Sequence, residues 1–585
     1  MPDIGKQPVR LLRYVGRHKV EIALTFVCAI VTVGINLYLP FIMRRAIDGL
    51  TDGSIGRSGL TRELVLYAGL SAITLYFSRH LRKIPLKLSH KVEYALRKDV
   101  FDHLTRMDQD YFRTERTGDL ITRMSSDMLL VRDSIGQGLL QGIRTTGVLV
   151  FASIIMLATD TALALLVLSL YLPMTLVFFL VLKSLRRRQK PLQEKVSDVS
   201  SFCQESFSGV RCIKGFAIEQ RRIAMFEAIN SDLVRLHLRM QRARQALWPF
   251  MAFWFCLSVV MILNLGGREV IAGRRSLGTL VQFMQYLLYM QWPLLAVSWV
   301  ASLLQRGKVS WNRIKEILEQ EPAIRDSDQT DHSIKSLRGE IVLENLSLDI
   351  AGRRFLHDIN LQIASGKTLG ITGPTGSGKT LLVSLVARLT DPTQGRICID
   401  GHDVKTIPLD MLRNHIGFAA QEPILFSQTL QHNIGFGVDE PEQRLIHWAA
   451  DIAHLKKDVE TFPDKYETMI GERGVTLSGG QRQRTSISRA VARHPEILIL
   501  DDVLSAVDTQ TEAAIMGKLR PVMRQRTTLF VSHRVSTLRY ADEIIVIEDG
   551  RITQRGSHDD LVETPGYYCE LNTMQQIEKE MEADS

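Results

Sequence analysis

The residues with the clearest chemical potential form one glycine-rich stretch near the middle of the chain. It follows an apolar run, 368–372, and precedes another, 381–386, a pattern typical of a buried strand, a turn and a helix start. Glycines in such a turn let backbone N–H groups close around phosphate oxygens, and the helix N-terminus favours negative charge. The sequence therefore predicts a phosphate-binding loop in which Lys379 reaches the β- and γ-phosphates of ATP and Thr380 binds Mg²⁺. The loop consists of Gly373, Pro374, Thr375, Gly376, Ser377, Gly378, Lys379 and Thr380.

The elements that carry this loop belong to a chain of at least two domains, because 585 residues exceed one hydrophobic core. A hydrophobic content of 45% favours membrane segments. The net charge of +9 is uneven: residues 338–585 carry 27 Lys and Arg against 35 Asp and Glu, whereas the first 337 carry 45 against 28. The basic excess thus accompanies the apolar half, where it predicts cytoplasmic anchors and no nucleic-acid site. The six cysteines have no metal or disulfide spacing and fit a reduced compartment or membrane burial.

Six apolar segments are long enough, or nearly so, to cross a bilayer. They are 20–42, 62–82, 138–159, 161–184, 247–271 and 278–303. The second is the weakest, and the basic run 183–190 marks the cytoplasmic end of the fourth. An even number of spans predicts that both termini lie in the cytoplasm. Ionised groups are almost absent from the span centres, which argues against an ion-coupled transporter.

Aromatic and Met side chains are frequent in the last two spans. They suit bulky amphipathic ligands, and helix packing or an interfacial aromatic belt is the alternative interpretation. The connections after the second and fourth spans are about 55 and 60 residues long and predict long cytoplasmic helices. Within them, 111–120 with 123–127, and 209–219, resemble the two coupling regions of ABC exporters. In that family these regions contact the ATPase domain of the same chain or of its partner.

The second half of the chain is similar to the ATPase domain of the same family, motif by motif. The resemblance implies that Gln421 contacts Mg²⁺ and water, that 471–474 precede the signature motif, and that His533 contacts the γ-phosphate. In the family the signature binds the γ-phosphate of ATP held by the opposite subunit. The signature residues are Leu477, Ser478, Gly479, Gly480 and Gln481. The D-loop, which communicates between the two ATP sites, corresponds to Ser505, Ala506, Val507 and Asp508.

Two positions depart from the family pattern. Asp501, at the end of the apolar run 497–500, matches the carboxylate that holds Mg²⁺. The next position is usually Glu, which polarises the attacking water, but here it is Asp502, one methylene shorter. The position of the adenine-stacking aromatic falls on Ile350, and Phe355, the nearby aromatic, is out of register. These departures predict a pocket that holds ATP and hydrolyses it poorly.

The sequence thus predicts a multi-domain membrane protein, an all-α six-helix transmembrane domain followed by an α/β P-loop ATPase domain. The expected boundaries are 1–320 for the transmembrane domain, 321–338 for a linker, 339–575 for the ATPase domain and 576–585 for a tail. The resemblance implies ATP-driven export of hydrophobic or amphipathic compounds across the plasma membrane, with ATP and Mg²⁺. The expected partner is a second half-transporter with Glu at the catalytic position. A homodimeric exporter or lipid flippase, and an ATP-gated or regulatory membrane protein, are the alternatives.

Overall fold

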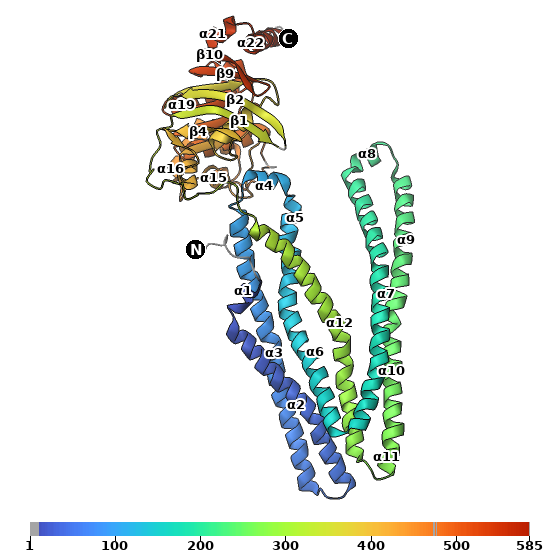
Figure 1. The fold of residues 1–585 in the computed structure, drawn as a ribbon. Coiled ribbons are helices and arrows are strands. Elements are labelled where there is room, and N and C mark those ends of the chain that lie inside the picture. Colours follow the sequence, from blue (N-terminus) through green and yellow to red (C-terminus); the bar gives the residue numbers. More distant parts are fainter. Residues whose placement is uncertain (1–10, 351, 472–473, 475–476, 584–585) are drawn as a thin grey trace. The chain divides into compact units, whose positions relative to one another are not determined.

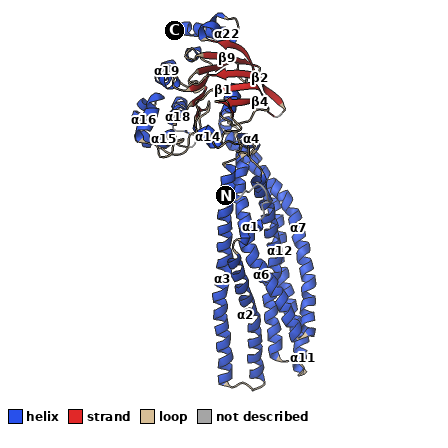
Figure 2. Cartoon of the chain, turned by 60° about the vertical axis from the view of Figure 1, so that its left-hand side comes forward, coloured by secondary structure: helices blue, strands red, loops and turns tan. Residues whose placement is uncertain are grey.

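A computed structural model describes residues 11–583 apart from 351, 472–473 and 475–476. The chain forms two compact units. The first takes the residues up to 105 together with 117–320, and the second takes 106–116 together with the residues from 321 onwards. Helices make up the first unit, and the strands all belong to the second among the described residues (Figure 2).

Long helices dominate the first unit. They are α1 (Leu11–Gly16), α2 (Lys19–Thr51), α3 (Arg57–Leu104), α5 (Thr117–Thr122), α6 (Met128–Thr159), α7 (Thr161–Ser208), α8 (Val210–Gly215), α9 (Glu219–Gln245), α10 (Leu247–Met261), α11 (Gly267–Ile271) and α12 (Leu277–Glu319). Two π-helical turns, η2 (Arg123–Asp127) and η3 (Ile262–Gly266), continue the helices on either side of them. The 48-residue lengths of α3 and α7 agree with spans that continue as long helices beyond a bilayer.

Five helical stretches within the described residues are long and apolar enough to cross a membrane. They are Lys19–Thr51, Thr117–Thr159, Thr161–Ser208, Glu219–Ile271 and Leu277–Glu319. The second predicted span, 62–82, lies in α3, which does not reach that criterion although it is helical throughout. The reason is its charge, because Glu63 and Arg79 leave only 64–78 without a charged side chain. These fifteen residues fall short of the ~20 that a bilayer core requires.

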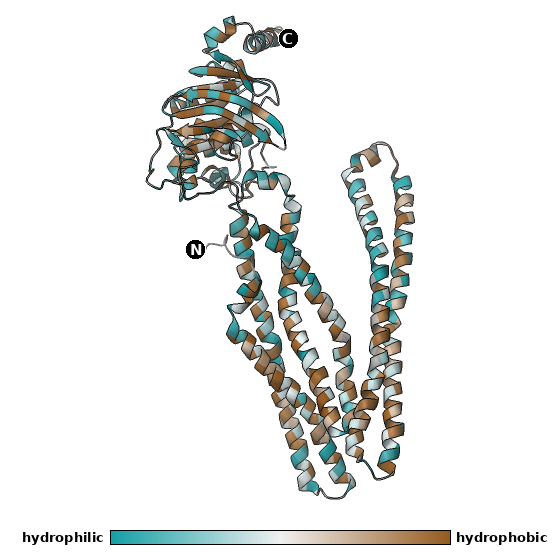
Figure 3. Ribbon diagram, in the orientation of Figure 1, coloured by the Kyte–Doolittle hydropathy of each residue, from teal (hydrophilic) through white to brown (hydrophobic). Residues whose placement is uncertain are grey.

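Packing within the first unit joins α2, α3, α6 and α12 along their lengths, and α7 lies beside α9 (Figure 1). Hydrophobic residues predominate at the ends of the helices that lie far from α8, and hydrophilic residues become more frequent toward α8 (Figure 3). Phe283, Tyr286 and Met290 of α12 are buried in the core of this unit. The Tyr286 hydroxyl donates to the Leu37 carbonyl at 2.8 Å. These three side chains therefore pack between helices, as the helix-packing interpretation expects.

The helix α4 (Gln109–Thr114), which lies in the first predicted coupling region, belongs to the second unit. Asp108 caps it by accepting a hydrogen bond from the Tyr111 N–H at 2.9 Å. The other oxygen of the Asp108 carboxylate accepts from the Ala323 N–H at 2.8 Å. One side chain therefore links this helix to the segment that follows α12.

Two sheets form the frame of the second unit. The first is antiparallel, in the order β2-β1-β4-β5, and the second has the order β10-β9-β3-β8-β7-β6, with β10 the only antiparallel member among these strands. The strands are β1 (Ile341–Ile350), β2 (Arg353–Ile363), β3 (Thr368–Thr372), β4 (Gln394–Ile399), β5 (His402–Asp403), β6 (Ile416–Ala419), β7 (Ile497–Asp501), β8 (Thr527–Val531), β9 (Glu543–Glu548) and β10 (Arg551–Gly556).

The six-stranded sheet is buried on both faces, and successive side chains of a strand alternate between the two faces. In β7, Ile497 and Ile499 join one hydrophobic cluster, whereas Leu498 and Leu500 join another. A strand buried on both faces reads as the continuous apolar run seen in the sequence. Besides α4, the helices described in this unit are α13 (Lys379–Val386), α14 (Leu409–Asn414), α15 (Leu430–Ile434), α16 (Gln443–Ile452), α17 (Lys456–Thr461), α18 (Gly479–Ala492), α19 (Thr509–Met523), α20 (Val535–Leu538), α21 (His558–Glu563) and α22 (Tyr567–Ala583), with the short 3₁₀ turn η4 (Lys465–Glu467). The predicted boundary between 575 and 576 falls inside α22.

Candidate nucleotide-binding site

The site begins where four neighbouring parallel strands end. β3, β8, β7 and β6 run in the same direction, so their carboxyl ends meet at one edge of the sheet. The glycine-rich loop follows β3, Asp501 ends β7, and His533 and Gln421 follow β8 and β6. Ligands bind at this edge in open α/β sheets. Strand order thus brings together residues that are up to 160 positions apart in the sequence.

The glycine-rich loop has the backbone that its sequence predicts. Gly373 and Gly378 have φ of 144° and 101°, in the region that favours glycine. A Cβ at Gly373 would lie 2.0 Å from the Ile547 carbonyl oxygen, so the loop passes too close to β9 for a side chain. Gly378 then stands at the N-terminus of α13, whose first residue is Lys379. This strand, turn and helix can surround phosphate oxygens with backbone N–H groups.

Lys379 and Ser377 fit an anionic ligand that carries several oxygens. The Lys379 ammonium donates to the Gly373 and Pro374 carbonyls at 2.8 and 2.7 Å. Burial lowers the pKa of Lys379, and the carboxylates of Asp502 and Asp501 oppose that shift. The Ser377 hydroxyl is buried without a hydrogen-bond partner among the described residues. A buried polar atom without a partner is costly, and a phosphate oxygen would satisfy it.

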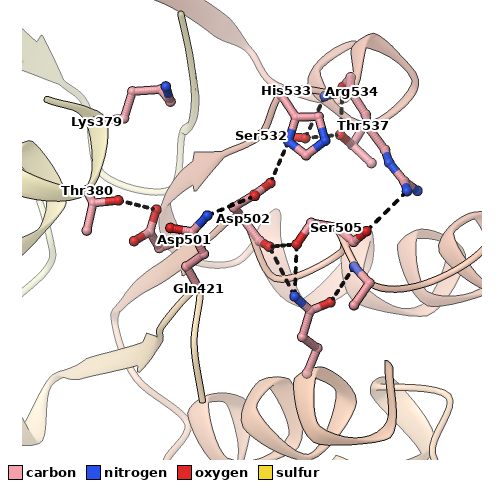
Figure 4. Close-up of polar contacts among 12 residues, drawn as sticks. Lys379, Thr380, Gln421, Asp501, Asp502, Ser505, Ser532, His533, Arg534 and Thr537 are labelled. Carbon is pink, nitrogen blue, oxygen red and sulfur yellow. Dashed lines mark hydrogen bonds and ion pairs between the residues drawn. The ribbon is translucent and has the colours of Figure 1, made fainter. Parts of the chain in front are cut away.

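Hard oxygen ligands for a cation lie at the other side of the loop. The Thr380 hydroxyl donates to Asp501 Oδ1 at 3.2 Å, and Asp501 is 1% exposed (Figure 4). Burial is the main cause that raises the pKa of Asp501, and Asp502 adds to it. A hydroxyl and a carboxylate in contact are oxygen donors of the kind that Mg²⁺ prefers. The residues present therefore fit the expected metal.

Asp502 lies among the other polar side chains of the site. Its φ is 47°, unusual for a residue with a side chain, and its backbone N–H donates to the Val531 carbonyl at 3.0 Å. Its Oδ1 lies 2.9 Å from Nδ1 of His533, and its Oδ2 accepts from Gln421 Nε2 at 3.4 Å (Figure 4). The hydrogen bond to Asp502 raises the pKa of His533, while burial opposes the rise. The structure thus brings Gln421, Asp502 and His533 into direct contact.

A cavity of about 540 Å³ joins these groups into one pocket. Its lining includes Lys379, Thr380, Gln421, Asp501, Asp502, Ser532 and His533. Two aromatic side chains, Phe355 and Tyr567, also line it. Ile350 does not line it; this residue packs on the hydrophobic core beneath the antiparallel sheet. Contact of Ile350 with the adenine base therefore stays a prediction, and Phe355 is the nearby aromatic that lines the cavity.

A β-bulge explains why Phe355 takes this position. In the pairing of β1 with β2, Leu348 is opposite Leu356 and Asp349 is opposite Arg354. Phe355 is thus the extra residue of β2, and an extra residue re-aims its side chain. The Arg353 guanidinium lies 5.2 Å from the centre of the Phe355 ring. The alternation of β1 and β2 alone cannot reveal this change of face.

The predicted signature residues begin α18 in a separate place. The Ser478 hydroxyl accepts from the Gln481 N–H at 3.2 Å, and the Gln481 side chain accepts from the Ser478 N–H at 3.0 Å. This capping box fixes the helix start, whose N–H groups favour an anion. Leu477 is buried, and a Cβ at Gly480 would lie 3.1 Å from the Ala506 carbonyl oxygen. The signature residues are absent from the lining of the pocket.

The predicted D-loop lies between these two places. Gln483 of α18 donates to the Ser505 hydroxyl at 2.9 Å and accepts from the Ala506 N–H at 2.9 Å. Asp508 caps α19 by accepting from two backbone N–H groups. Arg534, next to His533, donates to the Val507 carbonyl at 3.1 Å. In the loop 471–474, Glu472 and Arg473 lie outside the described residues.

Comparisons with known proteins agree with this architecture. The family described as ABC transporter transmembrane region matches residues 22–294, and the family described as ABC transporter matches residues 356–505. The Multidrug resistance-like ATP-binding protein MdlA of Escherichia coli (strain K12) is 33% identical over 555 residues, which cover 93% of this chain and 92% of that protein. The chain belongs to the ABC transporter family.

Other similar proteins indicate the same family. An ATP-dependent lipid A-core flippase of Desulfotalea psychrophila is 33% identical over 477 residues, covering 81% of this chain and 83% of the flippase. A bacterial Atm1-family ABC exporter solved with ATP bound has a TM-score of 0.79 at 24% identity, covering 95% and 98% of the two chains, which shows the shared fold. The chain is therefore an ABC exporter with fused transmembrane and ATPase domains, and its ATPase domain hydrolyses ATP to drive transport.

The sequence motifs of the ABC transporter did not reveal several residues of the site. Tyr567 and Phe355 line the pocket from segments without a phosphate motif. Gln483 and Arg534 hold the D-loop through contacts that only the fold creates. Their one signal in the sequence is proximity, because Gln483 lies two residues after the signature and Arg534 follows His533.

Proposed function

We propose that this chain is one half of a heterodimeric ABC exporter in which its own pocket binds ATP and hydrolyses it slowly. Asp502 is the observation that carries the proposal. It occupies the place after β7 where the family usually has Glu, and its carboxylate contacts His533 and Gln421. A general base must lie within hydrogen-bond reach of the water that it activates. A shortfall of roughly 1 Å costs on the order of a hundredfold in rate.

Within this pocket each side chain has a separate task. Lys379 and the loop 373–378 bind the phosphates of ATP. Thr380, Asp501 and Gln421 would hold Mg²⁺, which would supply positive charge against the phosphate oxygens. His533 donates to the γ-phosphate, and its raised pKa favours the protonated form that does so. Asp502 orients the His533 ring, because its carboxylate fixes one of the two ring nitrogens.

The catalytic contribution of this chain to the dimer lies in its signature. Leu477–Gln481 is complete, and Ser478 begins a capped helix whose N-terminus favours a γ-phosphate. In the dimer these residues complete the pocket of the partner subunit. The partner is a different half-transporter with Glu at the position of Asp502. Its own signature motif can be degenerate, because that motif completes only the slow pocket of this chain. Two six-span halves then form the transport path.

The transported compound is hydrophobic or amphipathic, and drugs and lipids are the two classes that the relatives suggest. The names of the Escherichia coli and Desulfotalea psychrophila relatives refer to multidrug resistance and to a lipid A-core flippase. Exposed aromatic side chains on α10 and α12 support an apolar ligand or a lipid environment; they include Trp248, Phe253 and Trp292. The chain resides in the plasma membrane with its ATPase domain in the cytoplasm. Neither nucleic acid nor an ion gradient has a role.

A homodimeric exporter or flippase is the second candidate. The intact capping box of the signature favours it, because both pockets of such a dimer need this motif. A regulatory or ATP-gated protein is a third, and electrical recordings in a planar bilayer distinguish it, since open-channel currents contradict alternating access.

Two measurements test the proposal. The full-length chain is purified from its native membranes, and its subunits are identified by mass. ATP turnover is then measured for the chain alone and for the complex. We expect the chain alone to be slower by about a hundredfold. Robust turnover by the chain alone would contradict the unequal pockets. ATP-dependent uptake of an amphipathic dye or a labelled lipid into inverted vesicles then tests export and separates the two substrate classes.

A further inference from the structure

The C-terminal helix α22 contacts the loop that carries His533. The side-chain amide of Gln575 donates from Nε2 to the His533 carbonyl at 2.7 Å. Its Oε1 accepts from the Val535 N–H at 2.9 Å. The His533 carbonyl lies in the short connection between β8 and α20, and the Val535 N–H belongs to the first residue of α20. One planar side chain thus binds a donor and an acceptor on the two sides of Arg534, which restricts the backbone at His533.

The start of α22 is firmly held, so it can support this contact. Tyr568 is 0% exposed and packs with Val535 and Leu538 in one hydrophobic cluster. Its hydroxyl lies 2.8 Å from Nδ1 of His558, and its N–H donates to the Gln554 side chain at 3.1 Å. A buried aromatic ring with a satisfied hydroxyl fixes the position of a helix. Gln575 lies two turns further along the same helix.

The same helix also reaches the nucleotide pocket directly. Tyr567, its first residue, lines the cavity together with Phe355 and the phosphate-binding loop. Burial is the main cause that raises the pKa of Tyr567, so its hydroxyl stays neutral. Residues of α22 therefore contact both the wall of the pocket and the loop of His533. The matched ABC transporter region ends at residue 505, well before this helix.

We propose that α22 is a working part of the nucleotide site, in which Gln575 is a positioning residue for His533. The inference rests on the proposed ATP pocket and assigns a new residue to it. The His533 ring is held at Nδ1 by Asp502, so the place of its other nitrogen depends on where the backbone holds the ring. Gln575 fixes that backbone. It acts on hydrolysis and not on ATP affinity, because the phosphates are bound chiefly by the loop 373–380.

Three variants of the full-length chain in lipid nanodiscs test this role. Gln575→Met keeps the length and volume of the side chain but removes both hydrogen bonds. Gln576→Ala is the matched control, an exposed neighbour on the same helix. Lys379→Ala tests the ATP pocket itself. Rates are expressed relative to the unsubstituted chain, so the comparison does not depend on how fast Asp502 supports hydrolysis.

For Gln575→Met we expect kcat for ATP hydrolysis to fall by about tenfold, with KM changed by less than about twofold. Gln576→Ala should keep both constants, and the thermal midpoint of Gln575→Met should stay within about 2 °C of the unsubstituted chain. An unchanged kcat, or a rise in KM that accompanies a lower thermal midpoint, overturns the inference. If Lys379→Ala still hydrolyses ATP, the proposed ATP pocket is wrong. If Lys379→Ala loses ATP hydrolysis but Gln575→Met leaves kcat unchanged, only the positioning role of Gln575 is wrong.

Gln575→Glu gives a readout that a general packing role would not produce. A protonated Glu can donate to the His533 carbonyl and accept from the Val535 N–H, whereas an ionised Glu repels that carbonyl. Its kcat relative to the unsubstituted chain should therefore begin to recover as the pH falls from about 7 to about 5, toward the ordinary pKa of a Glu carboxyl, about 4.3. Among the described residues, the charged groups at this loop include His533, Asp502, Arg534 and Glu512, whose carboxylate pairs with the Arg534 guanidinium, and the unsubstituted chain carries the same groups as a reference. A ratio that does not change with pH contradicts the role.

Discussion

Replacing Asp502 by Glu is the sharpest test of how this pocket works. The carboxylate of Asp502 ends in contact with Nδ1 of His533 at 2.9 Å and Gln421 Nε2 at 3.4 Å. An added methylene moves the carboxylate about 1 Å further from the backbone. The pocket beside it has a volume of about 540 Å³, so the longer side chain has room. The substitution should therefore bring a base within reach of the attacking water.

The magnitude follows from the cost of misplacement. A shift of roughly 1 Å is worth on the order of a hundredfold in rate, which corresponds to about 2.7 kcal/mol in the activation free energy. We expect Asp502→Glu to raise kcat by a factor between about 10 and 100, with little change in KM, because the phosphate-binding loop is untouched. The longer side chain also loses the contact with His533, and this loss reduces the increase in kcat toward the lower end of that range.

The assay is steady-state ATP hydrolysis by the full-length chain in lipid nanodiscs. Asp502→Asn is the matched control, since it keeps the shape and removes the base, and it should hydrolyse no faster than the unsubstituted chain. Lys379→Ala gives the background. The reasoning is refuted if Asp502→Glu binds ATP normally and turns over no faster than the unsubstituted chain.

Further predictions concern charge, signature and pocket wall. Asp502 raises the pKa of His533, so the contact between them stabilises the folded state fully below about pH 6.5, and this stabilisation is lost as the pH rises through the pKa of His533 in the folded state. Asp502→Asn should therefore lower the His533 pKa measured in an NMR titration. An unchanged His533 pKa contradicts this prediction. Ser478→Arg should abolish ATP turnover of the assembled dimer by blocking a capped helix start, and turnover within about twofold of normal would argue against a role in trans. Phe355→Ala should raise KM for ATP by about 3- to 10-fold, whereas Ile350→Val should not; equal effects would contradict the placement of Phe355.

Local sequence was sufficient for the parts of the site whose chemistry is fixed by neighbours in the chain. The glycine-rich loop is an example, because positive φ at Gly373 and Gly378 and a following helix are properties of consecutive residues. The buried strand before Asp501 is another, since a central parallel strand is apolar on both faces. For such segments composition and spacing carry the geometry.

Contacts between distant segments could not be predicted in the same way. Phe355 enters the pocket because of a bulge in β2, and one extra residue changes which face every later side chain occupies. Tyr567 reaches the same cavity from a helix near the end of the chain. For Phe355 and Tyr567, tertiary packing decides what the local pattern leaves open. The span in α3 differs, because its own charges interrupt the apolar stretch while the helix itself continues.

The contacts around Asp502 suggest why a shorter carboxylate can be retained. Gln483 donates to the Ser505 hydroxyl, which in turn donates to the Asp502 carbonyl at 2.9 Å. Gln483 lies on α18, whose first turn carries the signature. The Asp502 carboxylate contacts His533, and the Asp502 backbone is linked to α18 through Ser505 and Gln483. These contacts give Asp502 a structural role that is separate from its proposed role as a base. In the proposed dimer, such a link would let ATP held in one pocket affect the signature that serves the other, whether or not the first pocket hydrolyses its own ATP.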